Sequence, residues 1–275
     1  MSAQLRGALF RLVHGGALRN ACIFALVLSV LMAVASVGLV PFDDTPPTSG
    51  ASLVAVVGGA IFYSAASSYF CVRLAMDDIA GGFAKTLLAD VPGERALTLR
   101  REYHAAMLLV AALVPAAVLL VATAMTLVVF LVIGLVPPAA ELVHLVLWLV
   151  LTWLVSWAYA CLATVATWKF CSRSAATLWA VLVSSGLAGL VLGMLVATAG
   201  VWWGAPWLAD VVVWLPSAGL RYLGAVASIP LDAGGVAGWL ARDAQTLVRL
   251  LASSLGVFVI SVLVTLLSAS RKDVA

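Results

Sequence analysis

The sequence predicts an all-helical integral membrane protein with six transmembrane helices. Of its 275 residues 64% are hydrophobic and only 10% are charged, whereas a soluble domain usually carries about 25% charged residues. The mean hydropathy is +1.16. Apolar runs of roughly the ~20 residues that a spanning helix needs recur along the chain, and basic residues gather in alternate connecting segments. Together these observations exclude a soluble globular protein and indicate one transmembrane domain over residues 1–275.

The first 20 residues predict an amphipathic helix on the inner membrane surface. Arg6, Arg11 and Arg19 alternate there with leucine, phenylalanine and valine. A helix with basic and apolar faces lies in the plane of the headgroups. The uncharged run that follows predicts the first span, from about Ala21 to Val40.

Five further apolar runs predict the remaining spans. These are about Leu53–Ala75, Ala105–Val136, Ala139–Trp168, Ala175–Val201 and Leu247–Ser268. Between the last two, residues 202–246 contain several tryptophans and prolines. Because tryptophan prefers the headgroup layer, we expect an insert of short helices on the outer side there.

The basic residues predict the orientation in the membrane. With six spans, twelve of the 15 lysines and arginines fall on the side of the two termini, and only Arg221, Arg242 and Arg249 fall on the other. Lysine and arginine are enriched in cytoplasmic loops. We therefore expect a multi-pass protein of the cytoplasmic membrane with both termini inside.

Hydroxyl groups in the second span admit two interpretations. Hydroxyls can bond to carbonyls of their own helix and serve packing, or they can line a path for a substrate. The candidate path residues are Tyr63, Ser64, Ser67 and Tyr69, with Ser68 beside them.

Small residues form a stripe in the fifth span. They recur at every fourth position, which allows another helix to approach closely. The partner is either within the chain or in a second copy of it. The stripe consists of Ser185, Gly189, Gly193 and Ala197.

Residues 76–104 are the longest polar interruption of the chain and are expected to face the cytoplasm. Within them Phe83, Leu87 and Leu88 recur at helical spacing, and Pro92-Gly93 cannot continue a helix. A short amphipathic helix in water is suited to docking on a partner.

The order of residues in this segment resembles the first cytoplasmic loop of the type-2 permeases of ATP-binding-cassette (ABC) exporters. The layout of the chain, with an amphipathic N-terminal helix, six spans, a minimal second inner loop and an outer insert, is similar to that family as well. The residues that carry the resemblance are Asp78, Gly82, Lys85, Leu87, Leu88, Pro92, Arg95, Arg100 and Arg101.

The resemblance implies a membrane permease subunit of an exporter. The loop would be the coupling helix that seats in a groove of a separate ABC ATPase. A second permease subunit, identical or different, would meet this one around a central path, largely at the second and fifth spans. The coupling residues would be Asp78, Gly82, Phe83, Lys85, Leu87, Leu88 and Arg95.

No catalytic, cofactor or metal site is expected on this chain. The run GGFAKT lacks a phosphate-loop glycine at Ala84, so ATP and Mg²⁺ are expected on the ATPase. Glu141 and His144 have the spacing of a di-iron motif without its second copy, which favours a surface or interfacial pair. The four cysteines fit buried fillers, and no basic patch indicates nucleic-acid binding.

Two other functions share much of this pattern. A non-transporting immunity or assembly protein would have the same architecture. A membrane-embedded enzyme is a weaker alternative: Asp77 and Asp78 beside Arg73 would have to hold Mg²⁺, and such sites need further carboxylates on facing helices.

Overall fold

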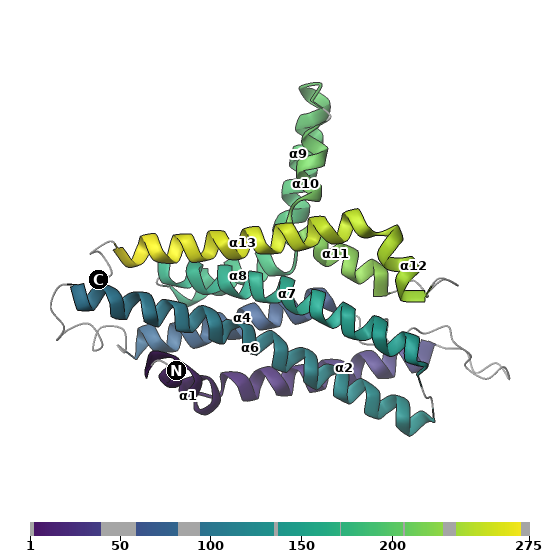
Figure 1. Cartoon of the computed structure of the whole chain (residues 1–275), viewed down its shortest axis with the longest axis horizontal. Helices are drawn as coiled ribbons and strands as arrows, with labels where there is room; N and C mark the ends of the chain where they lie inside the picture. Colours follow the sequence, from purple (N-terminus) through teal and green to yellow (C-terminus); the bar gives the residue numbers. More distant parts are fainter. Residues whose placement is uncertain are drawn as a thin grey trace.

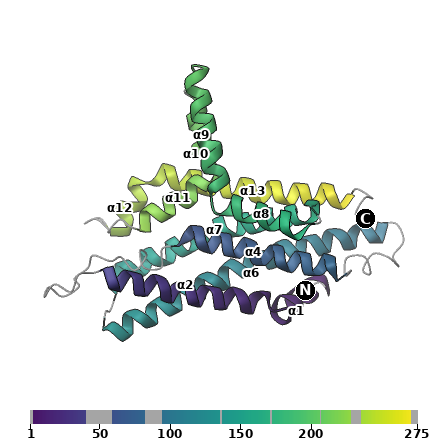
Figure 2. The ribbon, with the colours of Figure 1, turned by 180° about the vertical axis from the view of Figure 1, so that it is seen from behind.

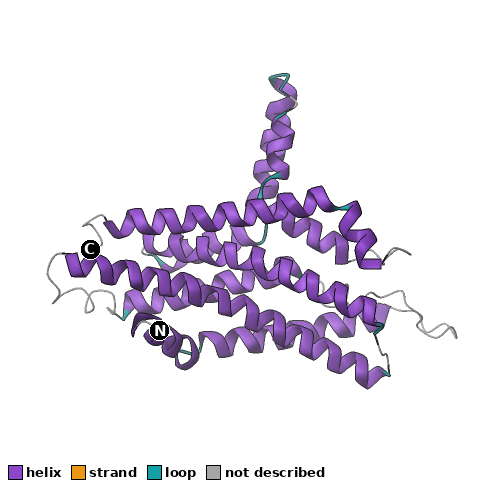
Figure 3. Ribbon diagram, viewed as in Figure 1, coloured by secondary structure: helices purple, strands orange, loops and turns teal. Residues whose placement is uncertain are grey.

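All of the secondary structure is helical in the part of the chain that the computed structural model describes (Figures 1 and 3). This part comprises residues 3–39, 59–81, 94–134, 137–170, 172–205, 207–227 and 235–270. The all-helical fold class is therefore confirmed. The helices are α1 (Ala3–His14), α2 (Ala17–Leu39), α4 (Ala60–Ala80), α6 (Glu94–Ile133), α7 (Ala139–Phe170), α8 (Arg173–Ser184), α9 (Leu187–Trp202), α10 (Leu208–Val213), α11 (Pro216–Ala227), α12 (Gly235–Arg242) and α13 (Ala244–Ser270).

Among the described residues, three helices are long and apolar enough to cross a membrane. They contain the candidate spans Thr98–Val132 of α6, Ala139–Phe170 of α7 and Ala244–Leu267 of α13. Counting the bent pairs α1–α2 and α8–α9 as one span each raises the number to as many as five. The helix α4 occupies the described part of the expected second span, and it is not among these candidates. The first residues of that expected span, 53–58, lie outside the description. Six spans thus remain a prediction.

The long helices lie side by side in one bundle (Figures 1 and 2). The helix α4 packs against α7, and α2 packs against α6. The side chains of Tyr63, Trp148 and Val110 are fully buried between them. The shared direction of α6, α7 and α13 is the natural direction for the membrane normal.

The helix α6 begins earlier than expected. It starts at Glu94 rather than near Ala105, so the second half of the polar segment is helical. A helix of this length, 40 residues, extends about 60 Å, twice the thickness of the hydrocarbon layer. It includes Pro115 without a break. The polar first turns therefore project beyond the apolar part of the bundle.

The expected fifth span is not one straight helix. The helix α8 ends at Ser184, Gly186 adopts a left-handed conformation with φ 77°, and α9 departs at 63°. After the return by α10, the helix α11 packs on α4 and α7, the helices that α8 also contacts, and on α13. Its second residue, Ser217, lies beside Gly186 and Gly189.

The helices α8 and α11 therefore follow one another along the bundle, with α9 and α10 inserted between them (Figure 1). Each has 12 residues, so that together they extend about 36 Å, enough for a hydrocarbon layer of about 30 Å. We call α9 and α10 the arm. It projects from the side of the bundle in both ribbon views (Figures 1 and 2).

Candidate functional site: the Asp78 junction

Three helices meet at the buried carboxylate of Asp78, in the last turn of α4. Nε of Arg11, from α1, lies 2.7 Å from Oδ1. The hydroxyl of Tyr103, from α6, donates a hydrogen bond of 2.8 Å to Oδ2. The carboxylate is thus engaged on both oxygens by residues 67 positions upstream and 25 positions downstream of it. We call these three residues the Asp78 junction.

The position of Asp78 is electrostatically unfavourable without these partners. The residue is only 3% exposed, and the carboxyl end of a helix repels negative charge. Burial raises the pKa of Asp78, while the hydrogen bond from Tyr103 and the charge of Arg11 oppose this rise. Arg11 and Tyr103 therefore offset the free-energy cost of burying the carboxylate of Asp78.

The helix α1 is fixed to the bundle around Arg11. Ala8 and Leu12 are fully buried, whereas Phe10 and Val13 are exposed. The helix stops at Gly15-Gly16, and α1 and α2 form a bend of 48°. The predicted N-terminal segment of residues 1–20 is thus divided, and its first helix exposes Arg6 and His14 as well as the apolar Phe10 and Val13.

Aromatic rings extend the junction to the end of α7. The ring of His104 lies 4.0 Å, between centroids, from that of Trp168, and Tyr103 lies 6.4 Å from the same indole. The last turns of α4 and α7 and the first part of α6 are therefore connected through one polar and aromatic cluster.

Two of the seven predicted coupling residues, Asp78 and Arg95, lie in the described part of the chain. Asp78 lies in α4 and is buried, contrary to the expectation that residues 76–104 face water. The hydrophobicity pattern predicts a loop at Asp78, because the pattern does not reveal that Arg11 and Tyr103, which are distant in the sequence, become its partners. Arg95 lies in the first turn of α6, with its side chain outside the description. The others lie outside the described residues and stay predictions: Gly82, Phe83, Lys85, Leu87 and Leu88.

Most of the candidate substrate path is buried inside the bundle. Tyr63, Ser64 and Ser67 are fully buried, whereas Tyr69 is 36% exposed. The hydroxyl of Ser67 donates a hydrogen bond of 2.6 Å to the carbonyl oxygen of Tyr63. This contact is the kind expected of a packing hydroxyl. Within this chain alone, only Tyr69 borders an open surface.

The small-residue stripe faces other helices of the same chain. A Cβ atom on Gly189 would overlap the side chain of Ser217, and one on Gly193 would lie 3.0 Å from Cγ1 of Val212. Ser185 precedes α9, and Ala197 is exposed. The stripe is therefore not one continuous face, and its two glycines allow α9 to pack against α10 and α11.

A second polar cluster joins α7, α11, α12 and α13. Trp239 donates a hydrogen bond of 3.0 Å to the hydroxyl of Tyr222, which donates one of 2.8 Å to Asp243. Burial opposes ionisation of Asp243, but hydrogen bonds from Arg242 and Tyr222 outweigh it and lower the pKa of Asp243.

His144 belongs to this second cluster rather than to the surface. It is buried, and its ring stands edge to face with Trp239, with 4.8 Å between centroids. The expectation of a surface or interfacial Glu141–His144 pair is therefore wrong for His144. The sequence could not show that α12 folds back over it.

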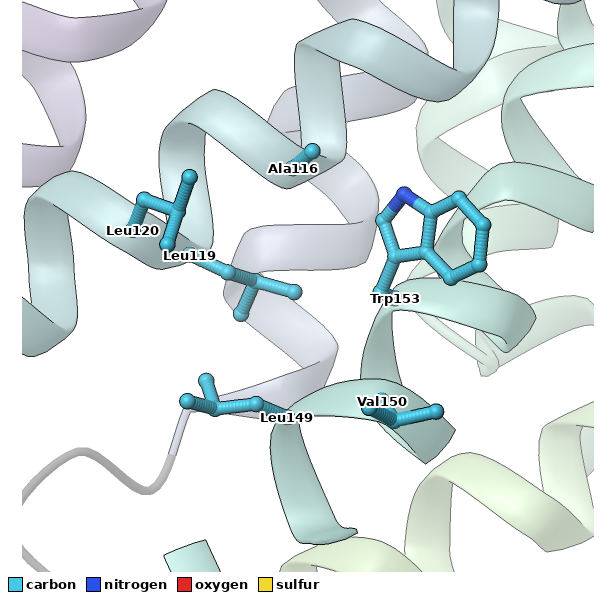
Figure 4. A pocket seen from close by; sticks show the side chains of 6 residues that line it. All are labelled: Ala116, Leu119, Leu120, Leu149, Val150 and Trp153. Atoms are coloured by element: carbon cyan, nitrogen blue, oxygen red, sulfur yellow. The ribbon is translucent and has the colours of Figure 1, made fainter. Parts of the chain in front are cut away.

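An apolar groove of about 210 Å³ lies between the middle parts of α6 and α7 (Figure 4). Its walls carry no charged side chain. The residues that line it are Ala116, Leu119, Leu120, Leu149, Val150 and Trp153.

No family model matches this chain, and neither the curated proteins nor the solved structures contain a match. Among the described residues, no group of three or more histidine, cysteine, aspartate and glutamate side chains could hold a metal ion.

Proposed function

We propose that this chain is the permease subunit of an ABC exporter, which moves a substrate across the cytoplasmic membrane with energy from a separate ATPase. Support comes from the apolar helices long enough to span a membrane, from the uneven distribution of basic residues, and from the N-terminal helix fixed at the polar end of α4 and α6.

The observation that carries the proposal is the hydrogen bond between Tyr103 and Asp78. These residues stand on the two helices that flank residues 82–93. A coupling loop has to pass displacement of an ATPase on to the spans. Because the hydrogen bond between Tyr103 and Asp78 joins the two flanking helices, a displacement of the loop moves both helices together instead of separating them.

In this proposal residues 82–93 form the contact with the ATPase, and the ATPase hydrolyses ATP. Phe83, Leu87 and Leu88 form the apolar contact with the ATPase, and Lys85 and Arg95 at its edge fix the register. ATP and Mg²⁺ bind to the ATPase. A second permease subunit completes the path, which in this chain borders Tyr69 on α4.

The proposal is tested by purifying the chain from its native membranes after mild cross-linking. We expect an ABC ATPase to co-purify in near-equal amount and its hydrolysis to rise when the permease is reconstituted with it. Recovery of the chain without any ATPase would contradict the proposal and favour a non-transporting immunity or assembly protein.

A further inference from the structure

We propose that the interior of the bundle binds ordered water molecules at the break between α8 and α11. Hydroxyl groups from three helices surround this break, and each is buried without a hydrogen-bond partner in the described part of the chain. The inference does not depend on a transport function. The residues are Ser64 and Ser68 of α4, Thr152 and Ser156 of α7, and Ser217 of α11.

The hydroxyl groups of α4 and α7 lie at one level of the bundle. Val72 of α4, Ala163 of α7 and Ala180 of α8 belong to one apolar cluster, which fixes the register of the three helices. The two serines of α4 precede Val72 by four and eight residues, and the two hydroxyl residues of α7 precede Ala163 by seven and eleven. The last turns of both helices adjoin the Asp78 junction. Both pairs therefore lie on the other side of the cluster, about 6 to 17 Å from it along the bundle.

These two pairs also face one another. Residues that are about one, two or three turns apart share one side of a helix. The serines of α4 are therefore on the side that carries Val72, and the hydroxyl residues of α7 are on the side that carries Ala163. Because Val72 and Ala163 belong to the same cluster, both pairs line the interface between α4 and α7.

The break between α8 and α11 reaches the same level. The helix α8 ends at Ser184, one turn after Ala180 of the cluster. Ser217, the second residue of α11, lies beside Gly186 and Gly189, just beyond this end. The ends of helices leave N–H and C=O groups without partners in the helix. The break therefore adds backbone groups that need hydrogen bonds to the five buried hydroxyl groups.

Water fits this site better than an ion. The surrounding parts of α4, α7, α8 and α11, residues 60–72, 145–168, 174–184 and 216–220, contain no charged residue, and a buried ion without a counter-charge is costly. A hydroxyl group both donates and accepts hydrogen bonds. A buried water molecule typically makes about three hydrogen bonds to polar groups that are otherwise unsatisfied. Irregular backbone at membrane depth is tolerated where it lines a water-filled cavity.

A cryo-EM structure of the natural chain in lipid nanodiscs, with a bound antibody fragment, tests the proposal directly. We expect density for ordered water within about 3 Å of the hydroxyl oxygens of Ser64, Ser156 or Ser217. Direct hydrogen bonds between the hydroxyl groups of α4 and α7, with no water between them, would overturn the proposal. So would a density that requires sodium or potassium ions, which would assign the site to a cation.

Radiolytic labelling gives a second readout that needs no structure. X-rays generate hydroxyl radicals from water in place, so the ring of Tyr159, which is buried and three residues after Ser156, should be oxidised in the natural chain. Thr152→Val removes one hydroxyl group and keeps the shape of the side chain. It should lower this oxidation by a factor of about three, since a buried water molecule depends on about three hydrogen bonds.

Thr164→Val is the matched control for this experiment. Thr164 is also buried on α7, but its hydroxyl donates a hydrogen bond of 2.8 Å to the carbonyl oxygen of Ala160. The oxidation of Tyr159 should therefore stay at the natural level in this variant. The proposal would be contradicted if Tyr159 is not oxidised in the natural chain, or if Thr152→Val and Thr164→Val give the same result.

Discussion

The hydroxyl of Tyr103 lies 2.8 Å from Oδ2 of Asp78, and this hydrogen bond joins the two helices that flank residues 82–93. Both side chains are buried. A hydrogen bond to a charged, desolvated acceptor is stronger than one between neutral groups. The bond therefore makes the last turn of α4 and the beginning of α6 one mechanical unit.

Removing this hydroxyl should weaken the unit without removing the ring. Tyr103→Phe leaves one oxygen of Asp78 without its donor, so we expect a loss of about 2 kcal/mol in the free energy of unfolding. Thermal unfolding in detergent measures it. Tyr69→Phe, at a half-exposed position of α4, is the control and should unfold like the natural protein. Equal effects of both changes would show that the hydrogen bond contributes nothing.

Replacing Arg11 by glutamine should make stability more dependent on pH. Burial already raises the pKa of Asp78 above its ordinary value of 3.8. A carboxyl group whose pKa is raised on folding stabilises the folded protein most at pH values below its ordinary pKa of 3.8. This stabilisation is lost as the pH rises through the pKa of the folded state. Without the charge of Arg11 the pKa rises further, so the deficit of the variant grows with pH.

Unfolding temperatures of Arg11→Gln and the natural protein at about pH 5 and about pH 8 measure this effect. The variant should be less stable by about 2 to 3 kcal/mol at the higher pH, because the buried carboxylate of Asp78 loses its counter-charge and keeps only the hydrogen bond from Tyr103, and closer to the natural protein at the lower pH. Asp78→Asn in the same chain should remove the pH dependence. A deficit that is constant over this range would contradict the role given to Arg11.

Gly189 should tolerate no side chain while Ser217 is present. A Cβ atom there would overlap the side chain of Ser217, so Gly189→Ala should separate α9 from α11 at a cost of about 1 to 3 kcal/mol. Ser217→Gly should restore much of this loss. Gly256→Ala on α13, where a Cβ would meet nothing within 4 Å, is the control. Thermal unfolding in detergent reports the outcome.

The sequence predicted the helical class, the long apolar helices α7 and α13 and the short helices after residue 202, because the spacing of apolar residues, tryptophans and prolines is a local property. The location of these helices relative to a membrane stays a prediction. The sequence could not predict the departure of α9 at Gly186, since the residues of α9 are as apolar as those of a straight continuation of α8 would be. It also could not predict that Asp78 is buried. The partners that allow this burial, Arg11 and Tyr103, come from other helices and become neighbours only through the packing of α1, α4 and α6.

The orientation can be tested with single cysteines in a chain without its native thiols. Position 85 should be labelled by a membrane-impermeant reagent only after the cells are opened, because basic loops stay in the cytoplasm. Position 44, in the short acidic segment after the first expected span, should be labelled in intact cells. Labelling of position 85 from outside would reverse the proposed topology.

Substitutions in the expected coupling loop test the proposed permease function most directly. Replacing Leu87 and Leu88 by alanine removes the expected apolar anchors of the ATPase contact, and truncating such an anchor costs about 2 kcal/mol or more of binding free energy. With membrane expression and unfolding temperature unchanged, we expect the amount of co-purified ATPase to fall at least tenfold and substrate-stimulated hydrolysis to be lost. If both stay at the natural level, residues 82–93 are not the coupling element, and the proposal of an ABC permease is contradicted.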